Sequence, residues 1–378
     1  MATKYCNPDL ASGDNDGTSE ANAYQDLSTA IAAISSGDLL YVKKTSSRHD
    51  DGVLDFATGI NGSATAMTII EGYGSTPGDN IKFEYAERFD VDARSIVFRN
   101  FDIEFSAGAD GVLQVDANAD NVHIHNCRLY NTQTGNFPAV YVNQTAIITN
   151  CEIISDGNIT TPASGAVRVT GGDQLIIDGC SIRGSKGIGA IPGGRGISIT
   201  NCIFYDAPNR NMTKGIEIDL QNSASEVKTC TISHNTVYHA NSAGIDFREL
   251  PIFDEDSAVL VSNNIFWGDG GGSGILNNDS TTTVGPVFIN NAMGNWGGDS
   301  NHMTGFGATN DVYGTIDLTA DPFVDGDNGD FRLNGTAGGG AACRSAAHPT
   351  TFPGLSFTNK RDVGAVGHTG LVERVSVS

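Results

Sequence analysis

The stretch ITNCIFY (199–205) decides the fold, because close copies of it recur along the chain. They read IHNCRLY (124–130), ITNCEII (148–154) and IDGCSIR (177–183). The Asn or Gly before the cysteine also marks units that lack the cysteine, at steps of about 27 residues. The markers are Gly72, Asn100, Asn126, Asn150, Gly179, Asn201, Asn235, Asn263 and Asn290. A repeat of this length indicates a solenoid, in which each unit stacks on the next.

Each repeat carries short runs of alternating apolar residues, such as SIVFRNFDIEF (95–105) and GISITNCIFY (196–205). Runs of this kind, bounded by Gly, Asn and Asp, are typical of β-strands, and helical spacing is nearly absent after residue 36. We therefore predict an all-β fold, a single-stranded parallel β-helix solenoid over residues 37–320. It should have about nine to eleven coils of about 27 residues each.

The two ends of such a solenoid need caps, because an open end exposes strand edges and core. Leu27, Ile31 and Ile34 share one face of a helical pattern, so residues 1–36 are expected to form an N-terminal arm and a short capping helix. Residues 321–378 are expected to form a C-terminal cap or tail.

The composition limits the classes of partner. The 378 residues include 22 Lys and Arg against 44 Asp and Glu, which gives a formal charge of −22. This balance disfavours binding to nucleic acid or to anionic membranes. No apolar run reaches the roughly 18 residues of a membrane helix. The N-terminal residues show no apolar signal segment, so we expect synthesis in the cytoplasm.

The cysteines of the repeat are Cys127, Cys151, Cys180 and Cys202. They recur at the coil period, which predicts one internal column of stacked side chains. Their spacing does not fit a C-x-x-C zinc site, and neighbouring coils hold Cβ atoms farther apart than a disulfide allows. We predict free buried thiols.

The strands before each marker supply two outward columns of side chains. One contains Tyr141, Arg168, Glu217 and Asp246, and the other contains Asn143, Thr170, Asp219 and Arg248. Adjacent coils lie about 4.8 Å apart, so Glu217, Asp219, Asp246 and Arg248 should cluster on one exposed patch. These four are the candidate catalytic residues, and Tyr141 and Arg168 are the candidate substrate-binding residues.

Two kinds of chemistry suit this patch. A glycoside hydrolase needs one carboxyl group as acid and another as base or nucleophile. A lyase needs a base that removes a proton beside a carboxylate neutralised by a cation or by Arg. The alternative is purely structural, with Asp219 and Arg248 as a cross-strand ion pair.

Calcium is the metal that the sequence suggests, although no cofactor is required. DGDNGDF (325–331) places Asp325, Asp327 and Asp330 near glycine, as oxygen-rich calcium loops do, and SGDNDGT (12–18) is similar. Both also fit ordinary turns between strands. His123 and His125 alternate on one strand without a third ligand at close range, so they do not indicate a metal site.

The order of motifs resembles the right-handed parallel β-helix proteins of the pectate-lyase-like group. A short helix precedes GDLLYV (37–42), the Asn-marked coils follow, and then come DPFVDGDNGDFRL (321–333) and KRDVGAVG (360–367). That group includes bacterial polysaccharide lyases and the tailspikes and other virion proteins of bacteriophages. The resemblance therefore implies a right-handed coil and leaves several functions open.

The first functional expectation is a structural protein of a bacteriophage virion, either a capsid decoration or a tail spike or adhesin component that presents its surface to glycans. Its partners would be other virion proteins, cell-surface polysaccharide and further copies of itself, with a trimer as one arrangement. The alternative is a polysaccharide lyase or glycoside hydrolase that acts outside the cell on the exposed β-helix face. The sequence leaves open whether the protein is an enzyme.

Overall fold

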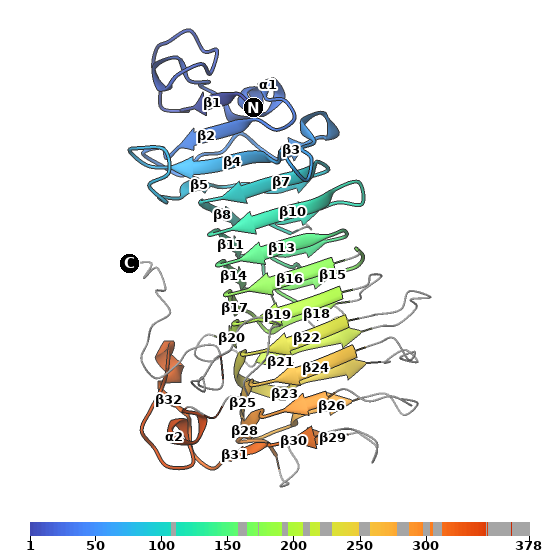
Figure 1. Ribbon diagram of the computed structural model, residues 1–378. Helices are drawn as coiled ribbons and strands as arrows, with labels where there is room; N and C mark the ends of the chain where they lie inside the picture. Colours follow the sequence, from blue (N-terminus) through green and yellow to red (C-terminus); the bar gives the residue numbers. More distant parts are fainter. Residues whose placement is uncertain are drawn as a thin grey trace. The chain divides into compact units, whose positions relative to one another are not determined.

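The computed structural model is built mainly from stacked parallel β-strands and the turns between them (Figure 1). The described residues are 1–106, 111–157, 165–172, 174–190, 196–206, 212–219, 229–248, 258–277, 287–297, 303–304, 312–344, 346 and 364. The chain divides into two compact units. Unit 1 comprises residues 1–181 and 192–194, and unit 2 comprises residues 182–191 and 195–378.

Unit 1 is built from parallel strands in two sheets. The strands of the first sheet are, in order, β1 (Thr3–Cys6), β2 (Leu39–Lys43), β4 (Thr68–Tyr73), β7 (Arg94–Arg99), β10 (Asp120–His125), β13 (Ala146–Thr149) and β16 (Gln174–Asp178). Those of the second sheet are β3 (Leu54–Phe56), β5 (Phe83–Tyr85), β6 (Phe89–Val91), β8 (Phe101–Phe105), β9 (Leu113–Val115), β11 (Arg128–Asn131), β12 (Val140–Val142), β14 (Glu152–Ser155) and β15 (Val167–Val169). β17 (Ser181–Arg183) contains the residue at which unit 2 begins.

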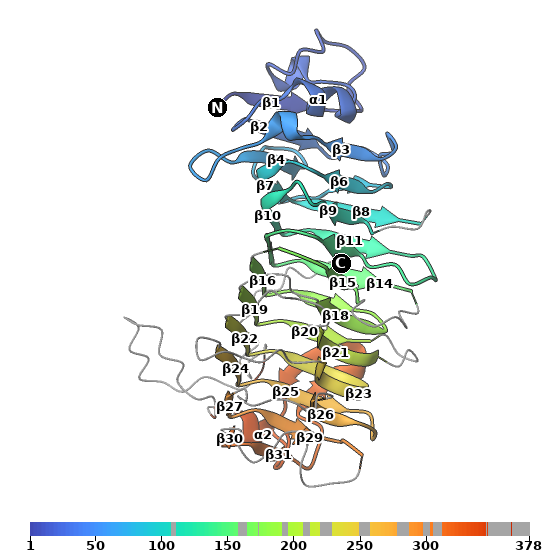
Figure 2. The same cartoon turned by 90° about the vertical axis from the view of Figure 1, so that its right-hand side faces the viewer.

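Unit 2 repeats this plan, and Figure 2 shows its strands edge-on. The first sheet contains β19 (Gly196–Thr200), β22 (Thr229–Ser233), β24 (Ala258–Ser262), β27 (Val287–Ile289) and β30 (Val312–Tyr313). The second contains β18 (Lys186–Ala190), β20 (Ile203–Tyr205), β21 (Met212–Asp219), β23 (Thr236–Arg248), β25 (Ile265–Gly268), β26 (Ser273–Asn277), β28 (Ala292–Gly294), β29 (Met303–Thr304) and β31 (Ile316–Leu318).

The fold class is the one expected, an all-β parallel solenoid. It has about eight turns, slightly fewer than the nine to eleven coils predicted. Nine markers enclose eight complete repeats. No helix in the described part of the chain is long and apolar enough to cross a membrane.

Inward side chains fill the interior of each unit, as the alternation predicts. In unit 1 the rings of Phe56 and Phe98 lie 4.7 Å apart, and those of Phe89 and Phe101 lie 5.4 Å apart. All four rings are fully buried. Contacts at these distances are typical of packed aromatic pairs, so successive coils are held by interlocking rings as well as by backbone hydrogen bonds.

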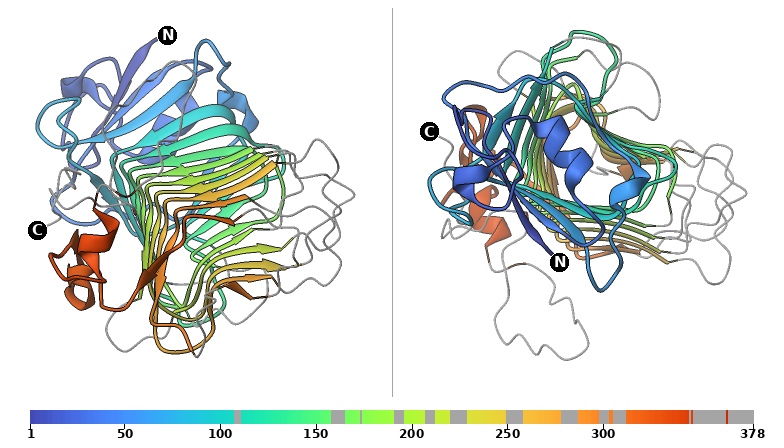
Figure 3. Two further views of the ribbon diagram at one scale, coloured as in Figure 1. Left: turned by 60° about the horizontal axis from the view of Figure 1, so that its bottom comes forward. Right: turned by 90° about the horizontal axis from the view of Figure 1, so that it is seen from above.

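The N-terminal helix lies where the sequence predicted it. Helix α1 (Leu27–Ala33) buries Leu27, Ala30 and Ile31, and Asp26 caps it by accepting from the Thr29 N–H at 2.6 Å. Seen from above in Figure 3, it lies across the N-terminal end of unit 1. The short helices η1 (Glu20–Asn22) and η2 (Thr58–Ile60) belong to the same unit.

The segment 321–333 forms a hairpin against the side of unit 2. Its antiparallel strands β32 (Phe323–Asp325) and β33 (Asp330–Leu333) flank η3 (Gly326–Asn328), and α2 (Gly340–Cys343) follows. The rings of Phe323 and Phe331 each lie 5.5 Å from Tyr238 in β23. This hairpin therefore packs on strands within the unit. Residues 347–378 lie outside the described residues, apart from Gly364.

The marker residues owe their identity to backbone conformation. Asn100, Asn126 and Asn150 in unit 1 have φ of 62°, 51° and 53°, and Gly179 has φ of 65°. Among residues with side chains, Asn tolerates this left-handed region best, and Gly has no steric cost there. At these four positions the marker is therefore the residue at which the chain bends from one strand into the next.

Substitution of Asn150 tests this role. Asn150→Ala is expected to lower the free energy of unfolding by about 1 kcal/mol, because Ala has a Cβ but no local hydrogen bond to offset a left-handed conformation. Asn150→Gly should stay within a few tenths of a kcal/mol of the wild type, on the order of a neutral change. Urea denaturation of the three proteins measures both values. Equal loss in the two variants would contradict the conformational explanation.

One loop of unit 1 is organised around a single carboxylate. Asp79 accepts from the backbone N–H groups of Gly74, Ser75, Thr76 and Ile81 at 2.9, 2.7, 3.1 and 3.1 Å. Burial opposes ionisation, but these donors outweigh it and lower the pKa of Asp79 from 3.8 to about 2.

The pH dependence of Asp79→Ala follows from this lowered pKa. A depressed carboxyl pKa contributes stability that is complete above the unfolded value and is lost as the pH falls through the folded value. The variant should therefore be less stable than the wild type near neutral pH, and the difference should shrink from about pH 4 to about pH 2. Urea unfolding at several pH values measures it, and a difference that does not change with pH would contradict the assignment.

Candidate functional site

The predicted catalytic residues come together on two adjacent strands of unit 2. In the pairing of β21 with β23, Glu217 lies opposite Asp246 and Asp219 lies opposite Arg248. This is the register that the sequence repeat predicted. The backbone of Asp219 is described, but its side chain lies outside the described residues.

The patch is much less exposed than predicted. The side chains of Glu217 and Asp246 are both 0% exposed, whereas that of Arg248 is 33% exposed. The prediction that all four residues form an exposed patch is therefore wrong for these two carboxylates. An outward position on a strand did not mean exposure, because neighbouring basic side chains cover the carboxyl groups.

Two lysines form ion pairs with these buried carboxyl groups. Lys214, whose side chain is 15% exposed, forms ion pairs with both Glu217 and Asp246. Lys186 Nζ lies 3.3 Å from Oε1 of Glu217, and its side chain is 5% exposed. Burial lowers the pKa of Lys186 from its ordinary value of 10.5, although Glu217 opposes that effect. Buried carboxylates require such partners, because an unpaired buried charge is strongly destabilising.

Arg248 completes the group at its exposed edge. Its Nη1 lies 4.0 Å from Oε2 of Glu217, and its Nε lies 3.9 Å from Oδ2 of Asp246. We call these five residues the basic cluster: Lys186, Lys214, Glu217, Asp246 and Arg248. Its described side chains hold three cations against two carboxylates, and only Lys214 and Arg248 present an appreciable surface to solvent.

The sequence prediction missed both lysines. Lys186 and Lys214 lie opposite each other in the register of β18 with β21, and neither belongs to the two columns that the sequence predicted. Lys214 lies three residues before Glu217, where strict alternation points a side chain inward. In the pairing with β23 a register shift falls just before it, between Met212 and Lys214. The repeated KGI phrase at 186–188 and 214–216 is the signal that could have revealed the pair.

Tyr141 and Arg168 lie together in unit 1, opposite each other in the pairing of β12 with β15. The Arg168 guanidinium lies 5.6 Å from the centre of the Tyr141 ring, which is a cation–π distance. Thr170 Oγ1 and Tyr141 Oη are 2.9 Å apart. Nε of Arg168 is buried without a hydrogen-bond partner. The two predicted binding residues thus form one stacked, partly buried pair.

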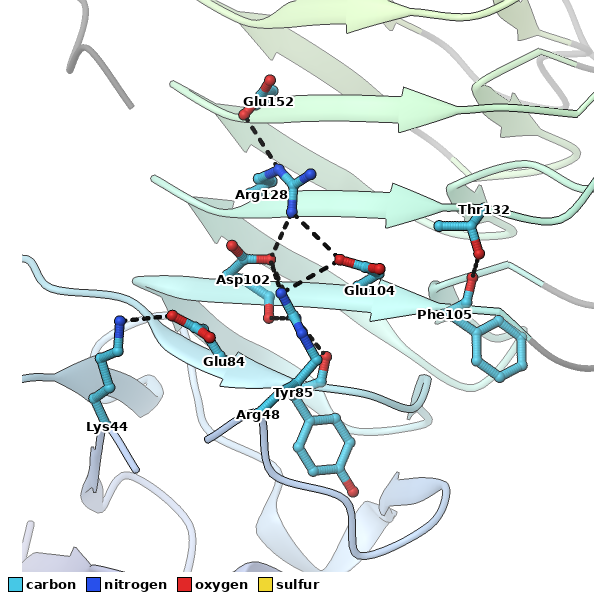
Figure 4. A network of polar contacts seen from close by, with 10 residues as sticks. All are labelled: Lys44, Arg48, Glu84, Tyr85, Asp102, Glu104, Phe105, Arg128, Thr132 and Glu152. Carbon is cyan, nitrogen blue, oxygen red and sulfur yellow. Dashed lines mark hydrogen bonds and ion pairs between the residues drawn. The ribbon is translucent and has the colours of Figure 1, made fainter. Parts of the chain in front are cut away.

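A second charged network crosses the strands of unit 1, as Figure 4 shows. Arg128 on β11 contacts Asp102 on β8 at 3.1 Å and Glu152 on β14 at 3.6 Å, and Arg48 contacts Asp102 at 3.3 Å. Such alternating charges hold strands in register, so we interpret this network as structural. The prediction missed it because it followed only the strands before each marker, and these residues lie after the marker.

The predicted calcium ligands do not gather. In the register of β32 with β33, Asp325 lies opposite Asp330, but the three carboxylates bond to different side chains. Asp325 accepts from Asn328 at 2.9 Å, Asp327 from Tyr238 at 3.0 Å and Asp330 from Arg332 at 2.8 Å. Among the described residues, no three His, Cys, Asp or Glu side chains are placed to hold a metal ion.

The predicted thiol column is confirmed. All seven cysteines are buried and none of them forms a disulfide, and the Cys127 N–H lies 3.5 Å from Sγ of Cys151 on the next coil. Burial raises the pKa of Cys151 far above the ordinary value of 9.0, so this thiol is inert at neutral pH. The cysteines pack in the interior of the coils and take no part in the candidate site.

Comparisons with known proteins agree with the architecture. One solved structure similar to this chain is the pectate lyase Pel9A, with a TM-score of 0.54, 14% identity, and coverage of 97% of this chain and 96% of that chain. A pectin methylesterase from Aspergillus niger has a TM-score of 0.34, 13% identity, and coverage of 80% and 90%. At these identities the first likeness shows the fold alone, and the second carries no argument. No curated protein sequence matches this chain.

The sequence itself matches a family model. The model describes the right handed beta helix region, and it matches residues 110–306. That range includes strands of both units and all five residues of the basic cluster. Because the match spans more than half of the chain, the protein belongs to the right-handed β-helix family.

Proposed function

We propose that this protein is a polysaccharide lyase that acts on an acidic glycan at the basic cluster. The observation that carries the proposal is the position of Lys214, held by two fully buried carboxylates beside the more exposed Arg248. A shared fold with a pectate lyase supports it. The substrate would be reached outside the cell.

The burial of the carboxylates favours a lyase over a hydrolase. A glycoside hydrolase needs two carboxyl groups that touch the glycosidic bond and its water. Glu217 and Asp246 are 0% exposed and each is paired with lysine, so neither can touch a sugar. A lyase needs instead a base and a cation, and Lys214 and Arg248 are the cluster residues that reach solvent.

The chemistry assigns a role to each group. Arg248 would pair with the carboxylate of a uronic acid residue and neutralise it, which makes the adjacent C–H bond more acidic. Lys214 in its neutral form would remove that proton, and elimination would break the glycosidic bond at the neighbouring carbon. Glu217 and Asp246 position the amine.

Incubation of the protein with acidic and neutral polysaccharides tests the proposal. Polygalacturonate, alginate and hyaluronan should be compared with dextran, which has no carboxylate. The expected result is ultraviolet absorbance of an unsaturated uronate from at least one acidic glycan and none from dextran. New reducing ends without this absorbance would indicate a hydrolase, and no cleavage of any acidic glycan would overturn the lyase proposal.

The virion role expected from the sequence has no support from the comparisons reported above. Nothing in the geometry of the basic cluster favours it either. The role as capsid decoration or tail component therefore stays a prediction, as do the oligomeric state and the partners that depend on it.

A further inference from the structure

The proposed chemistry does not use Lys186, although this lysine is the most deeply buried cation of the basic cluster. Its side chain is 5% exposed, and the carboxylate that it meets, Glu217, is 0% exposed. The two lie on neighbouring strands, β18 and β21, and Nζ is 3.3 Å from Oε1. An ion pair at this depth gains little net stability, because both charges lose their water.

The far oxygen of Glu217 is held by a second ammonium group. Lys214 donates a hydrogen bond to Oε2, and it also donates to Asp246. A donor on one oxygen of a carboxyl group draws electron density from its carbon and makes that carbon easier to attack. Asp246 lies opposite Glu217 on the adjacent strand β23 and is itself fully buried. A nucleophile and an activated carboxyl group therefore share one water-poor site.

We propose that Lys186 and Glu217 form an intramolecular isopeptide bond, an amide between the lysine Nζ and the glutamate Cδ. The neutral amine of Lys186 attacks Cδ of the protonated Glu217 carboxyl group, and the new N–C bond replaces the bond from Cδ to Oε1. Oε1 leaves as water with one proton from the acid and one from the amine. The proton released from the nitrogen passes to the leaving oxygen, so the step needs no other reagent.

Burial favours the bond in three ways. Amide formation removes two charges from a site where charges are costly. Exclusion of water protects the amide from hydrolysis. Burial also lowers the pKa of Lys186, which increases the share of the neutral amine that can attack. The remaining carbonyl oxygen, Oε2, can still accept from Lys214, so the bond is compatible with the role proposed for that lysine.

The intact mass of the wild-type protein tests this bond directly. We expect a mass lower than that of the sequence by one water molecule, in a fraction that grows on incubation of freshly made protein. Trypsin should fail to cleave after Lys186, and the digest should contain a branched peptide that joins the segments around Lys186 and Glu217. A full mass after prolonged incubation, with Lys186 peptides recovered unlinked, would overturn the proposal.

Variants locate the bond. Lys186→Met and Glu217→Ala should each restore the full mass, Lys214→Met should slow the loss of water, and Lys4→Met, a surface control, should show the wild-type loss. Loss of water that persists in Lys186→Met would place the bond elsewhere and overturn this assignment. These masses are read on denatured protein without any substrate, so they are independent of the outcome for the lyase proposal.

Discussion

Replacement of Lys214 by arginine is expected to lower the rate of uronate elimination by about 10²- to 10⁴-fold, the range that a general base contributes. Arginine stays protonated in proteins, so it can occupy the place of the ammonium group but cannot accept a proton. The change therefore removes the proposed base and keeps a positive charge between Glu217 and Asp246. The rate is measured as the appearance of unsaturated uronate at low substrate concentration.

The choice of arginine distinguishes a loss of the catalytic base from a loss of protein stability. Lys214→Met would leave two buried carboxylates with one partner fewer, and loss of one member of a buried ion pair costs about 3–5 kcal/mol. A loss of activity in that variant would have two explanations. Lys214→Arg should unfold at nearly the wild-type temperature, and Lys4→Met serves as the control for removal of an unrelated lysine. Wild-type rates in a folded Lys214→Arg protein would show that the base lies elsewhere.

The sequence carried most of the information about the fold, because the repeat specifies which residues face each other. It predicted that Glu217 faces Asp246 and that Tyr141 faces Arg168, and both pairs lie in register. Each pair follows from one alternating pattern and one period, and both are properties of the backbone. Parallel stacking converts a spacing along the chain into a contact in space.

Exposure at the site could not be predicted in the same way. The alternation places Glu217 on the outer face of its strand, but its burial depends on where two long lysine side chains turn. The register shift just before Lys214 in the pairing of β21 with β23 also leaves no period in the sequence. The chemical assignment changed for that reason, from paired carboxylates to a lysine and Arg248.

The alignment of the repeats also missed a shift of one residue. His234, with φ of 56°, occupies the left-handed bend in its coil, so Asn235 lies one place later than the marker alignment put it. Asn235 therefore continues the cysteine column, and Asn264 and Asn291 follow it. The alignment had placed Thr236 in that column. In an Asn–Asn pair such as 263–264, either residue could adopt the left-handed conformation of the bend. Only the backbone conformation in the structure shows which one does.

The Asn column supports the second large prediction, a destabilisation of unit 2 in Asn264→Leu. Asn264 is 0% exposed, and its amide group donates to the Ile232 carbonyl and to Oδ1 of Asn291, both at 2.9 Å. Its Oδ1 accepts from the backbone N–H of Asn235 at 2.9 Å. Leucine has a similar volume but leaves these groups unpaired. Since each orphaned buried polar group costs about 1–3 kcal/mol, we expect a loss of at least about 3 kcal/mol.

Tryptophan fluorescence during urea unfolding measures this loss in the unit where it occurs. The two tryptophans of the chain, Trp267 and Trp296, both belong to unit 2, so the signal reports on that unit even if unit 1 unfolds separately. Asn118→Ala is the matched control, because it removes an exposed Asn from unit 1 and should leave the tryptophan transition unchanged. If Asn264→Leu unfolded at the wild-type urea concentration, the hydrogen bonds of the column would contribute nothing net, and apolar packing alone would hold these coils together.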